Sequence, residues 1–230
     1  MIGTEPKPFS EVLQAIGRRS KPFVVGCGGC AKVCHTGGEP EVDEMVRQLQ
    51  AEGRVVPASG VPERTCYIHH VQTFFDQHPQ ELEACDCLVI LGCGGAVQTV
   101  RQATEERGMV KPIISALNSV GHMDTVISDT LWVERCSECG DCMLNETGGI
   151  CPITLCAKGL INGPCGGSRD GKCETDPERD CAWMLIYERL KALDQLDKMQ
   201  VIRGLRDHSK ANRPRKIMRT GAIPETSPAG

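Results

Sequence analysis

The amino-acid sequence predicts an α/β protein in two parts, a parallel-sheet domain and a cysteine-rich segment held together by metal. Over residues 1–130, apolar runs alternate with helix-forming stretches. After that point, glycine, proline and cysteine replace the hydrophobic periodicity. The chain also contains 15 cysteines among 230 residues. Alternating strands and helices are typical of a parallel sheet, whereas a segment without apolar periodicity needs another source of stability.

The first part contains strand and helix candidates in regular alternation. Amphipathic spacing predicts helices over residues 9–19, 40–52, 63–77 and 96–107. Short apolar runs predict strands over residues 23–25, 54–57, 88–91 and 112–114. This order favours a small Rossmann or flavodoxin-like domain, in which the first and third strands are neighbours.

The domain boundaries follow these changes in composition. Residues 1–130 form the predicted α/β domain, and residues 131–200 form the cysteine-rich domain with a terminal helix over 178–199. Residues 201–230 are basic and then proline-containing, which indicates a flexible or partner-bound tail.

Composition limits the function classes. The net charge is −4 and aromatic residues make up 3%, so neither charge nor stacking platforms favour nucleic acid. The sequence contains neither a recognisable export signal nor an apolar run long enough to span a membrane. We therefore expect a cytoplasmic protein with reduced thiols. An odd number of cysteines in that compartment favours metal ligands over disulfides.

Three cysteines lie in a glycine-rich loop directly after the first predicted strand, and these are Cys27, Cys30 and Cys34. Cys93 lies in a similar Gly-Cys-Gly-Gly turn after the third strand. Because ligands collect where neighbouring parallel strands end, we expect these four cysteines to hold one [4Fe–4S] cluster.

Three other cysteines of this part are alternatives to that set. Cys85 and Cys87 lie at the opposite end of the third strand and are expected to be core thiols, whereas Cys66 remains a possible ligand. Isolated histidines are expected to be surface or hydrogen-bonded residues. The glycine loop could also cradle a nucleotide phosphate, although it lacks the full Gly-x-Gly-x-x-Gly pattern.

Eight cysteines follow in the second part, and we expect all of them to bind metal: Cys136, Cys139, Cys142, Cys151, Cys156, Cys165, Cys173 and Cys181. The first three have the Cys-x2-Cys-x2-Cys spacing that ferredoxins use for one cubane. One division groups Cys151 with Cys156, Cys165 and Cys173, and Cys181 with the first three. Interleaved groupings are equally open. A structural zinc ion remains an alternative to one of these clusters because zinc also accepts four thiolates.

The sequence contains no recognisable catalytic motif, so no catalytic residue is predicted. A basic run near the end could dock an acidic partner or could simply be solvated: Arg203, Arg206, Lys210, Arg213, Arg215, Lys216 and Arg219. Zinc ribbons with this tail would suggest nucleic-acid binding, but the aromatic residues that usually accompany that function are absent. We therefore expect no nucleic-acid partner.

The pattern Cys151-Pro-Ile-Thr-Leu-Cys156, followed by Cys165-Gly-Gly, Gly171-Lys-Cys173-Glu and Asp180-Cys181-Ala-Trp183, resembles the C-terminal domain family of methylenetetrahydrofolate reductases. The upstream Val25–Cys34 loop and the Leu91–Gly95 turn are similar to the small iron–sulfur subunit of the two-subunit enzyme of acetogenic anaerobes. The resemblance covers roughly residues 10–200.

This resemblance implies a role in the methyl branch of the Wood–Ljungdahl pathway. A flavin-bearing catalytic subunit would reduce methylenetetrahydrofolate, and this chain would pass electrons to or from it, with further electron-transfer proteins as additional partners. The implied cofactors are two or more [4Fe–4S] clusters, with flavin in the partner. The resemblance also associates the family with zinc, so a structural zinc-binding subunit without electron transfer is the alternative.

Overall fold

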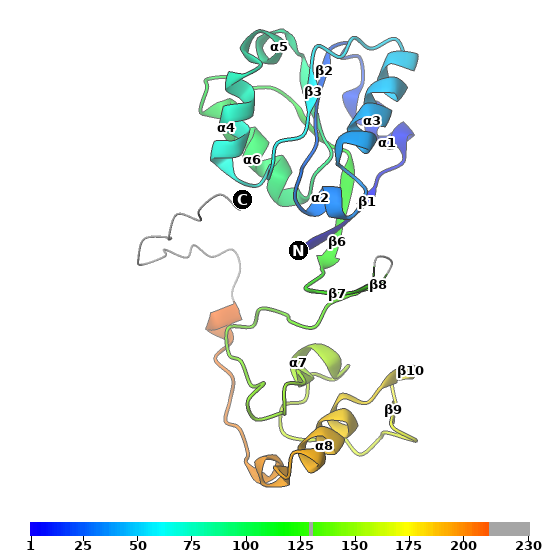
Figure 1. Ribbon diagram of the computed structural model, residues 1–230, viewed down its shortest axis with the longest axis vertical. Coiled ribbons are helices and arrows are strands. Elements are labelled where there is room, and N and C mark those ends of the chain that lie inside the picture. The colour runs from blue at the N-terminus through cyan, green and yellow to red at the C-terminus, as the bar shows by residue number, and fades with distance from the viewer. Residues whose placement is uncertain (129–130, 212–230) are drawn as a thin grey trace, which may run out of the picture. The chain divides into compact units, whose positions relative to one another are not determined.

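The computed structural model describes residues 1–128 and 131–211 (Figure 1). The chain divides into two compact units, residues 1–134 and residues 135–230. Residues 212–230 lie outside the described part, and with them Arg213, Arg215, Lys216 and Arg219 of the predicted basic tail. Among the described residues, no helix is long and apolar enough to cross a membrane.

A four-stranded parallel sheet forms the centre of the first unit. Its strands are β2 (Pro22–Val25), β3 (Ser59–Gly60), β4 (Cys87–Ile90) and β5 (Ile113–Ser115). Their order is β3-β2-β4-β5, so the first and third parallel strands are neighbours, as the flavodoxin-like order predicts. The prediction of a strand over 54–57 is wrong, because β3 pairs with β2 only from Ser59.

Helices cover both faces of this sheet (Figure 1). The helices are α1 (Phe9–Ile16), α2 (Cys30–Val33), α3 (Glu39–Ala51), α4 (Ile68–Asp76), α5 (Pro79–Ala84) and α6 (Gly94–Glu105). Val24 packs with α1 and α3, whereas Phe23 and Val25 pack with α4, α5 and α6. This alternation follows from the two-residue period of a strand, and it leaves both faces of the sheet buried.

Two antiparallel pairs of strands in this unit were not predicted. The first strand, β1 (Ile2–Pro6), pairs with β6 (Leu117–His122), and β7 (Thr125–Ser128) pairs with β8 (Leu131–Val133). Exposed positions along β6 and β7 give these strands little of the apolar patterning by which a strand is recognised.

The second unit has little regular structure and a small apolar core. Its elements are α7 (Pro152–Leu155), β9 (Lys172–Cys173), β10 (Asp176–Asp180), α8 (Ala182–Ala192) and two 3-10 turns, η1 (Leu196–Gln200) and η2 (His208–Ala211). The core consists of Trp183, Ile186 and Leu190, with a few partly buried side chains around them, including those of Cys156 and Cys181.

The terminal helix is shorter than the predicted 178–199. Residues 176–180 form β10 and pair with β9, so α8 begins only after Cys181. The helix ends before Asp194, whose φ of 55° lies in the left-handed region. Leu193 and Leu196 continue the apolar spacing of the predicted helix beyond α8, but both side chains are exposed.

Candidate metal centres

The glycine-cysteine loop after β2 lies close against its neighbours at the carboxyl edge of the sheet. The Gly26 amide donates to the Gly60 carbonyl at 2.8 Å, and the Cys27 amide donates to the Gly37 carbonyl at 2.8 Å. A Cβ atom at Gly26 would lie 2.5 Å from the Gly37 oxygen, so only glycine fits there. The loop therefore holds Cys27 at the end of β2 and leads directly into Cys30, the first residue of α2.

Cys93 lies at the end of the neighbouring strand β4, where it is the N-cap residue of α6. A Cβ atom at Gly92 would lie 3.7 Å from the Cys27 Cβ, so the two cysteine loops meet as the topology predicts. Negative charge is favoured at the N-terminus of a helix, which suits a thiolate ligand at this position.

A third loop, which follows β3, brings Cys66 to the same edge of the sheet. The Gly28 amide donates to the Pro62 carbonyl at 2.9 Å, and the buried Thr65 hydroxyl donates to the Gly26 carbonyl at 2.6 Å. Cys66 is an exposed residue whose thiol is partly desolvated, which raises its pKa, and the neighbouring thiols of Cys27, Cys93 and Cys30 raise it further. Cys66, which the sequence leaves as a possible ligand outside the predicted set, therefore lies close to three of the four predicted ligands.

Cys34, the remaining predicted ligand of this unit, lies at the C-cap of α2. Its thiol donates to the Ile2 carbonyl, with an Sγ–O distance of 3.7 Å. The Ile2 amide donates to the Cys30 Sγ at 3.4 Å. The N-terminal strand therefore contacts both cysteines of α2.

Cys85 and Cys87 are buried, in agreement with their interpretation as core thiols. Cys85 donates to the Leu82 carbonyl at 3.1 Å, and burial raises the pKa of Cys87 to about 12. Cys87 packs in the apolar cluster that contains Val24 and Val89, and Cys85 packs in the cluster that contains Phe23 and Leu88.

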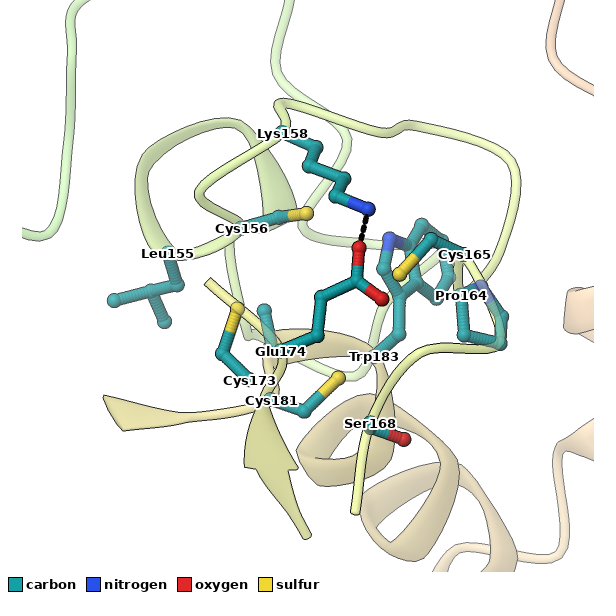
Figure 2. A pocket seen from close by; sticks show the side chains of 11 residues that line it. Leu155, Cys156, Lys158, Pro164, Cys165, Ser168, Cys173, Glu174, Cys181 and Trp183 are labelled. Carbon is teal, nitrogen blue, oxygen red and sulfur yellow. Dashed lines mark hydrogen bonds and ion pairs between the residues drawn. The ribbon is translucent and has the colours of Figure 1, made fainter. Parts of the chain in front are cut away.

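Four cysteines of the second unit line one small cavity (Figure 2). They are Cys156, Cys165, Cys173 and Cys181, and the cavity has a volume of about 20 Å³. Figure 2 shows the four sulfur atoms around a space into which Glu174 extends, with its carboxylate paired to Lys158. The division that places Cys151 with Cys156, Cys165 and Cys173 differs from this arrangement, because the fourth cysteine of the cavity is Cys181.

Local donors surround the sulfur atoms of this cavity. The Gly167 amide donates to the Cys165 Sγ at 3.5 Å, and the Thr175 hydroxyl lies 3.2 Å from the Cys173 Sγ. The Thr175 hydroxyl, followed by the Thr175 amide, lowers the pKa of Cys173. Hydrogen bonds to sulfur favour the thiolate, which is the form that binds metal.

Three of the other four cysteines of this unit make local contacts within their own loops. The Glu138 amide donates to the Cys136 Sγ at 3.4 Å, and the Cys139 thiol donates to the Asp141 carbonyl at 3.7 Å. The Cys151 Sγ lies 3.6 Å from the Thr154 hydroxyl. Cys142 is exposed. The residue after Cys139, Gly140, has a φ of 73°, a conformation that glycine adopts without strain.

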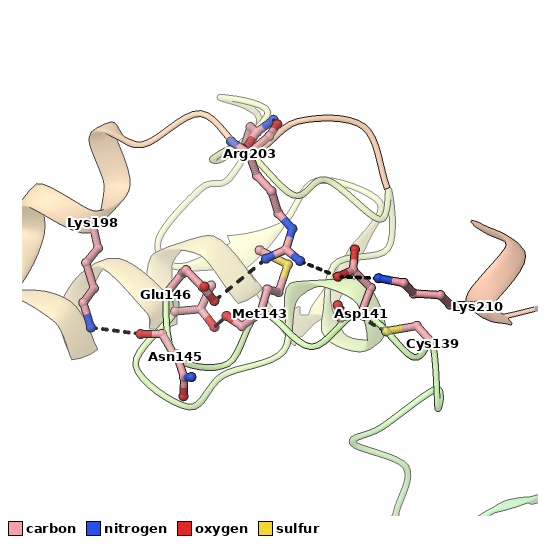
Figure 3. Close-up of polar contacts among 10 residues, drawn as sticks. Cys139, Asp141, Met143, Asn145, Glu146, Lys198, Arg203 and Lys210 are labelled. Carbon is pink, nitrogen blue, oxygen red and sulfur yellow. Dashed lines mark hydrogen bonds and ion pairs between the residues drawn. The ribbon is translucent and has the colours of Figure 1, made fainter. Parts of the chain in front are cut away.

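The described part of the basic C-terminal segment packs on the Cys139–Cys142 loop (Figure 3). Arg203 pairs with Asp141 at 2.9 Å and exchanges two backbone–side-chain hydrogen bonds with Asn162. Lys210 lies 3.9 Å from the same carboxylate, and its backbone lies against Gly140. Arg203 and Lys210 thus attach part of the predicted tail to its own unit, while residues 212–230 lie outside the described residues.

The donor set of these sites consists of thiolates, which suit zinc and iron–sulfur clusters. Within residues 1–128 and 131–211, no three Cys, His, Asp or Glu side chains converge closely enough to hold a single metal ion. A cubane distributes its four ligands over separate iron atoms, so its thiolates stand further apart than those around one ion. The looser groups described above therefore remain compatible with clusters.

Residues 115–209 match the model of a protein family described as methylene-tetrahydrofolate reductase C terminal. The matched range contains all eight cysteines of the second unit, and it supports a relation to methylenetetrahydrofolate reductase. A comparison with curated proteins finds no match.

Proposed function

We propose that this chain is the iron–sulfur electron-transfer subunit of a methylenetetrahydrofolate reductase complex. It would pass electrons to or from a flavin-bearing catalytic subunit in the methyl branch of the Wood–Ljungdahl pathway. The family match over residues 115–209 is the single observation that carries the relation to this enzyme. The convergence of cysteine loops at the edge of the parallel sheet supports the iron–sulfur part of the proposal.

An iron–sulfur cluster supplies reversible one-electron exchange when bound. The residues of this chain would bind it, tune it and limit its contact with water. Cys27 is 4% exposed and Cys93 is 8% exposed, so water has little access to their side of the site. Amide donors to sulfur, such as Ile2 to Cys30 and Gly167 to Cys165, stabilise negative charge and thereby raise a reduction potential.

A structural zinc ion in the second unit is the second candidate, because zinc accepts four thiolates. Cys156, Cys165, Cys173 and Cys181 line one cavity there, but Glu174 and Lys158 line it too, and these side chains would have to rearrange around a single ion. Zinc at this site and clusters elsewhere are compatible with each other. A purely structural subunit would have zinc at every site and no sulfide.

A nucleic-acid function has less support than either candidate. Arg203 and Lys210 of the basic run face Asp141 within their own unit, so their charges are partly neutralised. Phosphate binding would need those cations to be available.

Anaerobic purification of the full-length chain, followed by iron, zinc and acid-labile sulfide analysis, tests the proposal. We expect iron and sulfide in equal amounts, with visible absorption that bleaches on reduction. Zinc without sulfide would refute the electron-transfer role. Co-expression with the candidate flavin-bearing subunit tests the partnership, for which we expect a stable complex and reduction of the flavin by the reduced chain. Failure to recover any complex would count against it.

A further inference from the structure

Three neighbouring strands of the first unit each end beside a loop that carries a cysteine. In the sheet order β3-β2-β4, Cys66 follows β3, Cys27 follows β2 and Cys93 follows β4. All three strands are parallel, so these loops lie at one edge of the sheet. Cys30, one turn beyond Cys27, begins α2 at the same edge.

The loop that carries Cys66 is attached directly to the glycine-cysteine loop. Thr65, the preceding residue, is completely buried and donates to the Gly26 carbonyl at 2.6 Å. Gly28 donates to Pro62, and a Cβ atom at Gly28 would lie 2.9 Å from the Glu63 carbonyl oxygen. Cys66 is therefore held in place by hydrogen bonds and close backbone packing on the loop of Cys27 and Cys30.

Glycines lie directly beside these cysteines. A Cβ atom at Gly95 would lie 3.7 Å from the Cys93 Sγ and 4.0 Å from the Cys66 Cβ. A Cβ atom at Gly29 would lie 3.6 Å from the Cys27 Sγ. Gly95 therefore lies between the side chains of Cys93 and Cys66, which places these two cysteines close together.

The hydrogen bonds of Ile2 distinguish Cys30 from Cys34. The Ile2 amide donates to the Cys30 sulfur, which is a contact that a thiolate ligand can accept. The Cys34 sulfur instead lies 3.7 Å from the Ile2 carbonyl oxygen, a contact with the N-terminal strand. Cys34 is the C-cap of α2, one turn beyond Cys30, and the thiols that neighbour Cys66 are those of Cys27, Cys93 and Cys30.

We propose that Cys66, and not Cys34, completes the ligand set of the first unit beside Cys27, Cys30 and Cys93. Cys34 then contacts the N-terminal strand instead of the bound group. The inference rests on the proposed function only for the identity of the bound group, because four thiolates would form the site for a cluster or for zinc.

The test compares Cys66→Ala with Cys34→Ala in the full-length chain. Alanine is preferred to serine because a serine oxygen can itself bind iron. We expect Cys66→Ala, like Cys27→Ala, to contain about four iron and four sulfide fewer per chain than the parent protein. Cys34→Ala should keep the parent content. Loss of iron in Cys34→Ala, or full iron content in Cys66→Ala, would overturn the assignment.

Differential alkylation of the unmodified protein gives a second measurement that does not depend on the folding of a variant. Under anaerobic native conditions, iodoacetamide should label Cys34, while Cys66 should react only after chelation. Labelling of Cys66 with Cys34 protected would also overturn the assignment. If the parent chain contains zinc without sulfide, the electron-transfer proposal fails. The zinc content of Cys66→Ala and Cys34→Ala then shows which of the two cysteines is the fourth ligand.

Discussion

The two units use cysteine in opposite ways. In the first unit, Phe23, Val24 and other apolar side chains fill both faces of the sheet, and the cysteines of the proposed site lie at the strand ends. In the described part of the second unit, the buried cluster is small and consists of Trp183, Ile186 and Leu190, with Cys156 and Cys181 packed against it. A fold with a large apolar core can exist before metal binds, whereas we expect a fold with so small a core to depend on it.

Metal removal should therefore destabilise the second unit much more than the first, and this is the largest effect that we expect. After anaerobic chelation, peptides from residues 135–211 should lose protection against hydrogen exchange. Peptides from β2 and β4 should keep it because their apolar contacts remain. Mass spectrometry of the same sample measures the exchange of peptides from both units. Equal loss of protection in both would contradict the claim that the second unit depends more on metal.

Truncation of Trp183 tests the core of the second unit. Trp183 is 5% exposed and donates from its indole to the Leu160 carbonyl at 3.0 Å. Trp183→Ala should reduce the free energy of unfolding of this unit by about 3–5 kcal/mol. Hydrogen exchange in the metal-loaded protein measures that change in α8.

The matched control for Trp183 is Leu185→Ala on the same helix. Leu185 is 42% exposed, so its truncation should change the free energy of unfolding by less than about 0.5 kcal/mol. If Trp183→Ala reduced the free energy of unfolding as little as Leu185→Ala does, the apolar core would contribute little and metal alone would stabilise the unit.

Acid should destabilise the first unit in part through Asp86. Burial favours the neutral carboxyl, but amide donors from Ser20 and Lys21 outweigh it and hold the pKa of Asp86 below its ordinary value of 3.8. A lowered pKa in the folded state contributes stability that is complete above 3.8 and is lost as the pH falls through the folded value.

Asp86→Asn should remove this part of the pH dependence and should cost about 1 kcal/mol at neutral pH, since solvent reaches the carboxylate. Urea unfolding of the metal-free full-length chain, followed by far-UV circular dichroism at pH 7 and pH 3, measures both effects. An unchanged difference between the two pH values would show that Asp86 does not contribute.

The smallest expected effect concerns the C-terminal segment. Arg203 pairs with Asp141 in a partly exposed position, so Arg203→Ala should cost less than about 1 kcal/mol. Hydrogen exchange should nevertheless increase in residues 139–142 and 201–211, with no change in the first unit. Arg206→Ala, in the same segment, is the control. A larger increase in hydrogen exchange for Arg206→Ala than for Arg203→Ala would show that Arg206, and not Arg203, attaches the segment.

Several features of the fold were predictable because their signals are local. The apolar runs of β2 and β4 are continuous, and Val42 and Leu49 in α3 lie on one helical face, so periodicity identified these elements. The two-residue strand β3 is too short to have a period, so sequence pattern predicts it several residues before its actual start. Helical spacing continues through Leu193 and Leu196 and predicts a longer terminal helix, whereas β10 and Asp194 set its actual limits.

The sequence alone determined the parallel sheet, the neighbouring position of the first and third strands and the presence of cysteine loops at their ends. These follow from apolar periodicity and from spacing along the chain. Only the tertiary structure placed Cys66 beside Cys27 and Cys93 and grouped Cys181 with Cys156, Cys165 and Cys173. Which cysteines lie together is a relation in space between distant residues. Backbone hydrogen bonds and close packing at glycine determine it, and sequence spacing does not encode those contacts.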